Sequence, residues 1–448
     1  MIGLNFSFMM SDTIGETGLS EREVENIREK ALNAIRELKG KKWPELEYLD
    51  LPFQDTSAIK KEAKRLQEIS DYFLLLGIGG SALGPKCVLE ALSPYHNQMR
   101  DRSPKVFIYD NVDPSTLSSI FSLIDLKRTA VNVISKSGST AETAAGFMIA
   151  YDEMRKAHGE KADERFVLTT DPEKGELRRL AKEKNIASLP IPPGVGGRYS
   201  VLSPVGLLLA ELIGVDANEL LKGAKDIQTL CFKEEIWENP ALLFAALCYL
   251  MDVKEGRKTT VLVPYADRLR SFSEWFCQLW AESLGKLGMG LTPYPSVGTT
   301  DQHSQLQLWM EGPEDKVIVF MRIEDYGEEY EIPDVFGDYE SMKYLRGHSL
   351  SELIKAEEEA SELALAKIGR PNMVLTVPRI DAYHLGQLFY FFEIATPLAG
   401  FLYGVNPFNQ PSVEEGKLLT FGAMGRAGYE QKGKEIEEAR EKKRIFRL

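Results

Sequence analysis

The densest group of hydroxyl side chains lies in the segment VNVISKSGSTAE, residues 131–142. A β-branched apolar run ends at Ser135, and an alanine-rich segment of helical composition opens at Thr140. A strand-to-helix loop presents free backbone N–H groups that attract an anion, and the hydroxyls add donors. Because the loop lacks the GxxxxGK[ST] spacing of a nucleotide site, it indicates a small phosphomonoester. Taken alone, an ordinary Ser/Thr helix cap is an equally common reading.

A second loop, GIGGSA at residues 77–82, also follows an apolar run and fits the GxGxxA pattern. That pattern favours dinucleotide binding, so a nicotinamide-dependent oxidoreductase is one alternative. Such a site also needs an acidic residue about 20 positions further on. Asp110 lies somewhat too far along the chain to be that residue. The loop of residues 135–140, which we call the serine-rich loop, has no part in such a site.

Two residues in other segments could act on a reacting carbon. Arg198 stands in GGRYS, and a permanently protonated guanidinium can stabilise a developing oxyanion. Glu282 stands in AESLGK, after a stretch rich in Trp and Phe, and the apolar surroundings that we expect there would suit a general base. By itself, each is also typical of an exposed charged side chain.

Three further residues have side chains that could move protons or carry charge. His303 lies in the polar segment TTDQHS, which suits an imidazole that shuttles protons. Lys417 stands about one turn into a segment that follows NPFNQP, where it could place a cation in a site. His384 opens a strongly apolar helical segment, and we interpret it as structural.

The composition limits the classes of partner. The chain has 448 residues and a formal net charge of −13, which argues against general binding to nucleic acid or anionic membranes. No secretory signal and no uninterrupted membrane-spanning run is evident, so we expect a cytoplasmic protein. The four cysteines lack CxxC spacing and the five histidines lack HExxH spacing, so we expect reduced thiols and no metal site.

The order of apolar and helical segments predicts an α/β fold. Short apolar runs alternate with helical patterns, which is typical of parallel sheets covered on both faces. We expect strands at 72–78, 105–109, 129–135, 165–169, 259–264, 316–322 and 372–377. We expect helices at 218–230, 240–253 and 349–368 and a solvated helix in the charged tail, 433–448. In such sheets a ligand binds beyond the carboxyl ends of the strands, where both loops lie.

Six motifs, taken together and in this order, resemble the phosphoglucose isomerase family. They extend over residues 77–417, and the resemblance covers about residues 70 to 420. The motifs are GIGGSALGP (77–85), SKSGSTAET (135–143), VGGRYSVLSPVG (195–206), AESLGK (281–286), GTTDQHS (298–304) and NPFNQPSVEEGK (406–417).

The resemblance implies two doubly wound αβα sandwich domains of the sugar-isomerase type, with parallel sheets. The domain ranges that we predict are an N-terminal helical extension at 1–69, a first domain at 70–213, a second at 214–425 and a charged helical tail at 426–448. It implies reversible conversion of glucose 6-phosphate to fructose 6-phosphate, with no metal or organic cofactor. It also implies a homodimer with active sites at the subunit interface.

The resemblance also implies roles for residues that bind the substrate. It places the phosphate cradle at Ser135, Lys136, Ser137 and Thr140. It places Gly80 and Ser81 along the sugar, and Gln278 and Gln410 beside the substrate.

The remaining roles concern the chemistry. Glu282 matches the base that moves a proton between C2 and C1, and Arg198 matches the arginine that stabilises the enediolate. His303, from the neighbouring subunit, and Lys417 match the pair that opens the sugar ring. Glu142 matches a carboxylate near that histidine.

The motifs depart from the family pattern at Ala141, Pro193 and Gly416, none of them a catalytic position. These departures leave activity on mannose 6-phosphate open. A non-catalytic sugar-phosphate sensor is the other alternative, but a sensor needs only the serine-rich loop and not the four chemical residues together.

Overall fold

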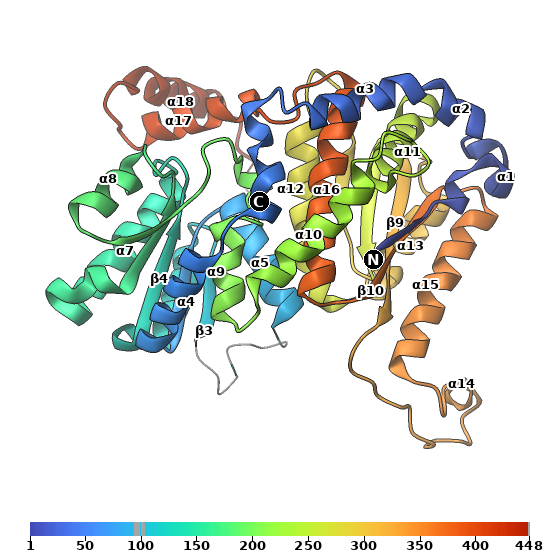
Figure 1. The fold of residues 1–448 in the computed structure, drawn as a ribbon, viewed down its shortest axis with the longest axis horizontal. Coiled ribbons are helices and arrows are strands. Elements are labelled where there is room, and N and C mark those ends of the chain that lie inside the picture. Colours follow the sequence, from blue (N-terminus) through green and yellow to red (C-terminus); the bar gives the residue numbers. More distant parts are fainter. Residues whose placement is uncertain (94–98, 100–103, 447–448) are drawn as a thin grey trace.

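The computed structural model describes residues 1–93, 99 and 104–446. Two five-stranded sheets lie in separate lobes, and helices cover both faces of each (Figure 1). The predicted α/β class with two doubly wound sheets is confirmed.

The first sheet is entirely parallel, with the strand order β3-β2-β4-β5-β6. Its strands are β2 (Tyr72–Leu76), β3 (Lys105–Tyr109), β4 (Thr129–Ile134), β5 (Phe166–Thr170) and β6 (Ala187–Pro190). The first four confirm the predicted runs to within two residues at each end. The strand order reverses between β2 and β4, so the loops that follow these two strands border one crevice.

Helices cover the two faces of the first sheet, and alternate residues of β2 show how. Leu74 and Leu76 pack with α6, α7 and α8, whereas Phe73 and Leu75 face the larger core shared with α4, α5 and α9. The bounds are α4 (Ser57–Ile69), α5 (Gly80–Leu92), α6 (Pro114–Leu123), α7 (Ala141–His158), α8 (Glu176–Glu183) and α9 (Pro204–Leu212).

The second sheet has the order β1-β10-β9-β7-β8. Its parallel strands are β7 (Thr259–Pro264), β8 (Thr292–Pro295), β9 (Lys316–Asp325) and β10 (Asn372–Arg379). The edge strand β1 (Gly3–Asn5) runs antiparallel to β10. The predicted N-terminal extension is therefore not wholly helical, because its first residues complete the second sheet.

The helices of the second lobe match the predicted patterns closely. The predicted helices at 218–230, 240–253 and 349–368 are α10, α11 and α15. The bounds are α10 (Ala217–Cys231), α11 (Pro240–Glu255), α12 (Arg270–Leu284), α13 (Gln302–Glu311), α14 (Glu340–Lys343), α15 (Leu350–Lys367) and α16 (Ala382–Tyr403). The N-terminal helices are α1 (Ser11–Ile14), α2 (Glu21–Asn26) and α3 (Arg28–Lys39).

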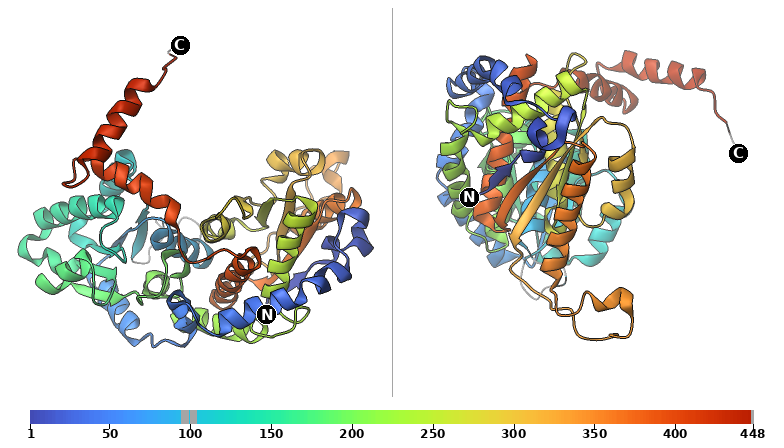
Figure 2. Two further views of the ribbon diagram at one scale, coloured as in Figure 1. Left: turned by 90° about the horizontal axis from the view of Figure 1, so that it is seen from above. Right: turned by 90° about the vertical axis from the view of Figure 1, so that its right-hand side faces the viewer.

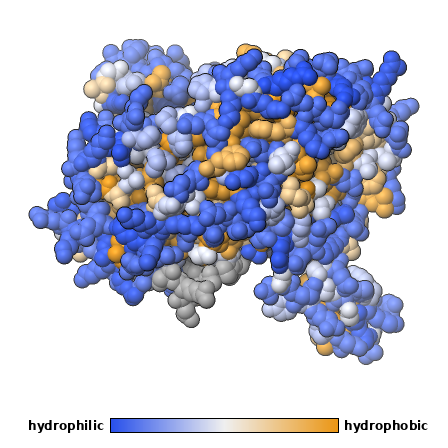
Figure 3. Space-filling view, in the orientation of Figure 1, coloured by the Kyte–Doolittle hydropathy of each residue, from blue (hydrophilic) through white to orange (hydrophobic). Residues whose placement is uncertain are grey.

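Helix α16 is the core helix of the molecule. Among the described residues it alone is long and apolar enough to cross a membrane, yet 94% of its apolar window is buried inside the protein. At its start, Asp381 accepts from the backbone N–H of His384 and pairs with Nδ1 of the same residue at 2.8 Å. These contacts fix His384 at the start of α16 and agree with its interpretation as a structural or buried histidine. The face drawn in Figure 3 is mostly hydrophilic, with apolar residues in scattered groups.

The chain ends in a hairpin of two helices, α17 (Glu414–Ala423) and α18 (Glu430–Lys442), which projects from the body (Figure 2). The two helices cross where a Cβ on Gly422 would lie 2.4 Å from the backbone nitrogen of Gly433. Neither helix has a buried residue. The predicted tail helix of 433–448 is thus the second half of a hairpin, and residues 447–448 of that prediction lie outside the described residues.

Candidate active site

A cavity of about 420 Å³ opens at the carboxyl ends of β2 and β4. It lies at the crevice that the strand order predicts. Seven of the predicted site residues line it, namely Ser81, Ser135, Lys136, Ser137, Thr140, Gln410 and Lys417.

Hydrogen bonds of its own hydroxyl groups hold the serine-rich loop in shape. The Ser135 hydroxyl lies 3.3 Å from that of Thr140 and accepts from the backbone N–H of Gly138 at 3.1 Å. Gly138 has φ +69°, and a Cβ there would lie 2.6 Å from the backbone nitrogen of Leu177. Thr140 precedes α7, but its side chain makes no capping hydrogen bond. The first N–H groups of α7 therefore stay available to an anion.

The Lys136 side chain points toward the loop of residues 193–198, which we call the arginine loop because it contains Arg198. Its ammonium donates to the backbone oxygen of Val195 at 3.0 Å and to that of Pro193. Burial lowers the pKa of Lys136, and the nearby Asp171 carboxylate opposes that effect. The ammonium thus joins the predicted phosphate loop to residues 193–197.

The glycine-rich loop that precedes α5 packs directly on the arginine loop. A Cβ on Gly80 would lie 2.1 Å from the carbonyl oxygen of Gly197. Gly79 has φ +55°, and a Cβ there would lie 3.0 Å from Nε2 of Gln278. Close packing therefore accounts for glycine at both positions without a dinucleotide. Gly80 contacts this loop, and Ser81 faces the first cavity.

Arg198 is only 3% exposed and its guanidinium is fully engaged. It donates to the Ser283 hydroxyl at 2.8 Å, to the backbone oxygen of Pro407 at 2.8 Å and to Oε1 of Gln410 at 3.1 Å. Nη1 also lies 3.4 Å from Oε2 of Glu282. Two residues predicted from separate motifs thus form one ion pair.

A second cavity, of about 470 Å³, opens beside Glu282. Gln278 and Gln410 also line it. Gln278 donates to Oε2 of Glu282 at 3.4 Å, and Oε1 of Gln278 is buried without a partner among the described residues. Gln410 lines both cavities, so a ligand in the first can extend toward Glu282.

The surroundings of Glu282 differ from those expected from the sequence. The preceding aromatic residues face the core, where Trp280 packs against Phe244 and Phe276. Gln278 and Glu282 are four residues apart and share the opposite, polar face of α12. The carboxylate is therefore surrounded by polar and charged groups.

Sequence reasoning missed Lys286, which lines the second cavity beside Glu282. Its ammonium donates to the backbone oxygens of Glu282 at 2.9 Å and Ser283 at 2.6 Å. Burial, together with the charge of Arg198, lowers the pKa of Lys286 to about 8, whereas Glu282 acts in the opposite direction. The position of Lys286 at the end of AESLGK could have indicated this contact, because a lysine at the end of a helix often bonds to the last carbonyl groups.

Lys417 reaches the first cavity from the projecting hairpin. Its ammonium is paired with Glu414 at 2.7 Å and its side chain is 54% exposed. Lys417 thus stands at the open side of the cavity, above the serine-rich loop.

His303 and Glu142 line neither cavity. His303 is exposed in the first turn of α13, and Glu142 is half-buried in the first turn of α7. The loop before His303 is well anchored, since Asp301 accepts from the backbone N–H of Val297 at 2.7 Å. Within one chain, the structure does not bring His303 to the other predicted residues.

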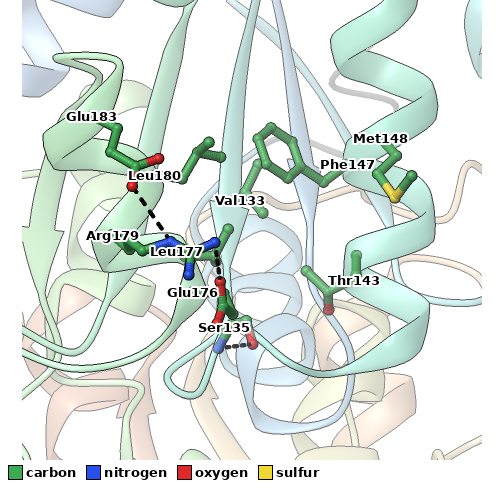
Figure 4. Close-up of a pocket in the computed structure, with 12 residues that line it drawn as sticks. Val133, Ser135, Thr143, Phe147, Met148, Glu176, Leu177, Arg179, Leu180 and Glu183 are labelled. Atoms are coloured by element: carbon green, nitrogen blue, oxygen red, sulfur yellow. Dashed lines mark hydrogen bonds and ion pairs between the residues drawn. The ribbon is translucent and has the colours of Figure 1, made fainter. Parts of the chain in front are cut away.

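A third, smaller cavity of about 180 Å³ lies between α7 and α8, behind the serine-rich loop (Figure 4). Apolar side chains such as Phe147 and Leu177 form its walls. At its rim Arg179 pairs with Glu176 at 3.0 Å and with Glu183 at 3.5 Å. Ser135 is the one predicted site residue in this wall.

The described residues contain no group of three or more His, Cys, Asp or Glu side chains that could hold a metal ion. All four cysteines are free, and Cys277 alone is not fully buried.

The structure defines a doubly wound α/β protein. It has a hydroxyl-lined cavity at a switch point and the Arg198–Glu282 ion pair nearby. The family model described as "Phosphoglucose isomerase" matches residues 61–426. The chain belongs to the phosphoglucose isomerase family.

Similar proteins support this assignment over nearly the whole chain. A glucose-6-phosphate isomerase of Carboxydothermus hydrogenoformans is 40% identical and covers 99% of both chains. One of Rubrobacter xylanophilus is 45% identical, covering 92% of this chain and 96% of its own.

Solved structures share the fold. A hypothetical protein from Thermus thermophilus matches with a TM-score of 0.84 and 35% identity, covering 95% of this chain and 100% of that one. A glucose-6-phosphate isomerase from Chlamydia trachomatis matches with a TM-score of 0.77 and 24% identity, covering 94% of this chain and 90% of that one.

Proposed function

We propose that this chain is a glucose-6-phosphate isomerase, which interconverts glucose 6-phosphate and fructose 6-phosphate in glycolysis and gluconeogenesis. Family membership and the names of its relatives support this activity. The observation that carries the proposal is the Arg198–Glu282 pair, which stands between a hydroxyl-lined cavity and a second cavity that share Gln410.

The proposed binding mode places the phosphate on the serine-rich loop. Ser135, Ser137 and Thr140 supply hydroxyls, and the start of α7 supplies backbone N–H groups. The sugar then extends past Ser81 and Gln410 toward Gln278. The phosphate takes no part in the chemistry, but its binding energy positions the reacting carbons.

The proposed mechanism has two stages. His303 and Lys417 first open the ring, one protonating the ring oxygen while the other accepts the anomeric proton. Glu282 then removes the C2 proton, the proton of the C2 hydroxyl passes to the C1 oxygen, and the same carboxylate returns a proton to C1, which leaves a ketone at C2. The enediolate formed between these steps is an anion, and Arg198 holds positive charge beside Glu282 to stabilise it. Protein side chains serve as the acids and bases for ring opening and for the transfer of the C–H proton in this scheme, so we propose that no metal or organic cofactor takes part.

We further propose a homodimer in which His303 serves the site of the neighbouring subunit. His303 is exposed and lines neither the first nor the second cavity of its own chain, and among the described residues neither cavity is lined by another histidine that could act with Lys417. Figure 2 shows α18 projecting from the body of the molecule, whereas Lys417 in α17 lines the first cavity. Glu142 would lie near the imported histidine.

We keep the division into domains 70–213 and 214–425 as a proposal, with extensions at 1–69 and 426–448. The first extension serves both units, because β1 joins the second sheet whereas α4 packs on α9 of the first. We propose a cytoplasmic location on the basis of the four free cysteines. We propose no nucleic acid or membrane partner on the basis of the net charge of −13.

The direct test is an assay of the purified protein with fructose 6-phosphate and a coupled readout of glucose 6-phosphate, after exhaustive EDTA treatment. We expect turnover that EDTA leaves intact. Activity that vanishes and returns with a divalent ion would replace this mechanism with a metal-dependent one. Reduction of NAD by the protein alone would instead favour the oxidoreductase.

A further inference from the structure

Helix α12 ends without the usual glycine closure, although both Glu282 and Ser283 lie in its last turn. The last four carbonyl groups of a helix have no donor within the helix, and a left-handed glycine often brings backbone donors to them. Here the residue after the helix, Gly285, has φ −70° and is not left-handed. Its N–H reaches only the carbonyl of Ala281, at 2.9 Å.

Lys286 supplies donors to the other three carbonyls. Its backbone N–H donates to Leu284 at 2.8 Å, and its ammonium donates to Glu282 at 2.9 Å and Ser283 at 2.6 Å. A cation at this end also interacts favourably with the helix dipole. These bonds hold the backbone of Glu282, which pairs with Arg198, and of Ser283, whose hydroxyl accepts from Arg198.

We infer that Lys286 is a positioning residue for the isomerisation, which closes α12 so that Glu282 and Arg198 keep their relative orientation. This inference rests on the proposed function of that pair. The charged groups facing the ammonium are Glu282 on its own helix and Arg198 from the arginine loop, and the opposite cavity wall, residues 410–413, carries no charge. Lys286 lies in the second cavity and not beside the serine-rich loop, so its loss should change turnover and not phosphate binding.

The test compares Lys286→Met, which removes the ammonium and keeps the stem, with Lys286→Arg, which keeps the charge. A hydrogen bond to a charged group contributes about 1.5–3 kcal/mol, so kcat of Lys286→Met should fall roughly 10- to 100-fold. KM for fructose 6-phosphate should stay within a few-fold, and Lys286→Arg should recover most of kcat. Lys355→Met is the matched control, because Lys355 also donates to a backbone oxygen, that of Glu324 at 2.6 Å, away from both cavities.

The pH profile separates positioning from simple loss of stability. Since the pKa of Lys286 is about 8, kcat of the wild-type chain should fall as pH rises through that value and the ammonium loses its proton. The fall should move to higher pH in Lys286→Arg and disappear in Lys286→Met. A Lys286→Met chain with wild-type kcat, or equal losses in both variants with an unmoved profile, would overturn the inference.

Hydrogen–deuterium exchange of residues 279–286 in the full chain provides a readout that needs no activity. Exchange should rise in Lys286→Met and not in Lys355→Met. If the wild-type chain failed to isomerise the substrate while exchange rose as expected, the proposed function would be wrong and the helix closure right. Unchanged exchange in Lys286→Met would contradict the closure itself.

Discussion

Glu282 carries the proton transfer in the proposed mechanism, and its partners Arg198 and Gln278 fix where the carboxylate points. Glu282→Gln keeps the shape and the hydrogen bonds but removes the base. A positioned general base contributes roughly 10²–10⁴-fold, so kcat should fall by at least that factor while substrate still binds. The measurement is kcat together with the affinity for fructose 6-phosphate. A Glu282→Gln chain within a few-fold of wild type would remove Glu282 from this role.

The serine-rich loop leads to a second prediction at the residue scale. Ser137→Ala and Thr140→Ala each delete one hydroxyl that faces the first cavity. Each loss of a bond to a charged group costs about 1.5–3 kcal/mol, so affinity for fructose 6-phosphate should weaken roughly 10- to 100-fold. Ser139→Ala is the control, because Ser139 lines none of the three cavities described above and its hydroxyl donates to that of Ser137. Equal losses on unphosphorylated fructose would mean that the loop holds something other than phosphate.

The sequence predicts which residue types do chemistry better than it predicts their partners. Arg198 and Glu282 come from separate motifs, and no local pattern shows that they pair. The aromatic run suggested apolar surroundings for Glu282, but a helix places residues 280 and 282 on different faces. The sequence also did not predict which carbonyl groups Lys136 and Lys286 bond to. A lysine side chain is long and flexible, so its spacing in the sequence does not identify the backbone group that it reaches.

At the scale of elements, the long apolar strands and the capped helices were predictable, whereas three of the four edge strands were not. The missed strands β1, β6 and β8 contain three or four residues each and lie at sheet edges. Two of them contain proline, which is tolerated at an edge but weakens the strand signal. The order of the strands, and hence the crevice between β2 and β4, follows only from the pairing.

The contact between the serine-rich loop and the arginine loop leads to a prediction about how these two elements depend on each other. Lys136→Met removes the ammonium that bonds to Pro193 and Val195, so the segment before Arg198 should loosen. We expect kcat and affinity for fructose 6-phosphate to fall together, with faster hydrogen–deuterium exchange in residues 193–198. Lys136→Arg, which keeps a charged donor, should lose less. Slower turnover with unchanged exchange would contradict this coupling.

At the scale of the whole molecule, the proposed role of His303 calls for a second copy of the chain. His303→Ala and Glu282→Gln chains should each be inactive as homodimers. In a mixed two-fold dimer one site collects both lesions and the other neither, so each mixed dimer should regain about half the activity of a wild-type dimer. The measurement is turnover after subunit exchange, with mixed dimers verified by mass. Verified mixed dimers as inactive as the parents would place His303 within its own subunit or outside catalysis.

The most direct test of the account follows the proton itself. Fructose 6-phosphate is incubated with the purified chain in D₂O, and NMR measures deuterium at C2 of the glucose 6-phosphate formed. An enediolate whose proton is held by Glu282 exchanges with solvent, so the account predicts deuterium at C2 with the wild-type chain and none with Glu282→Gln. Product that forms without solvent deuterium at C2, or exchange that survives in Glu282→Gln, would contradict it.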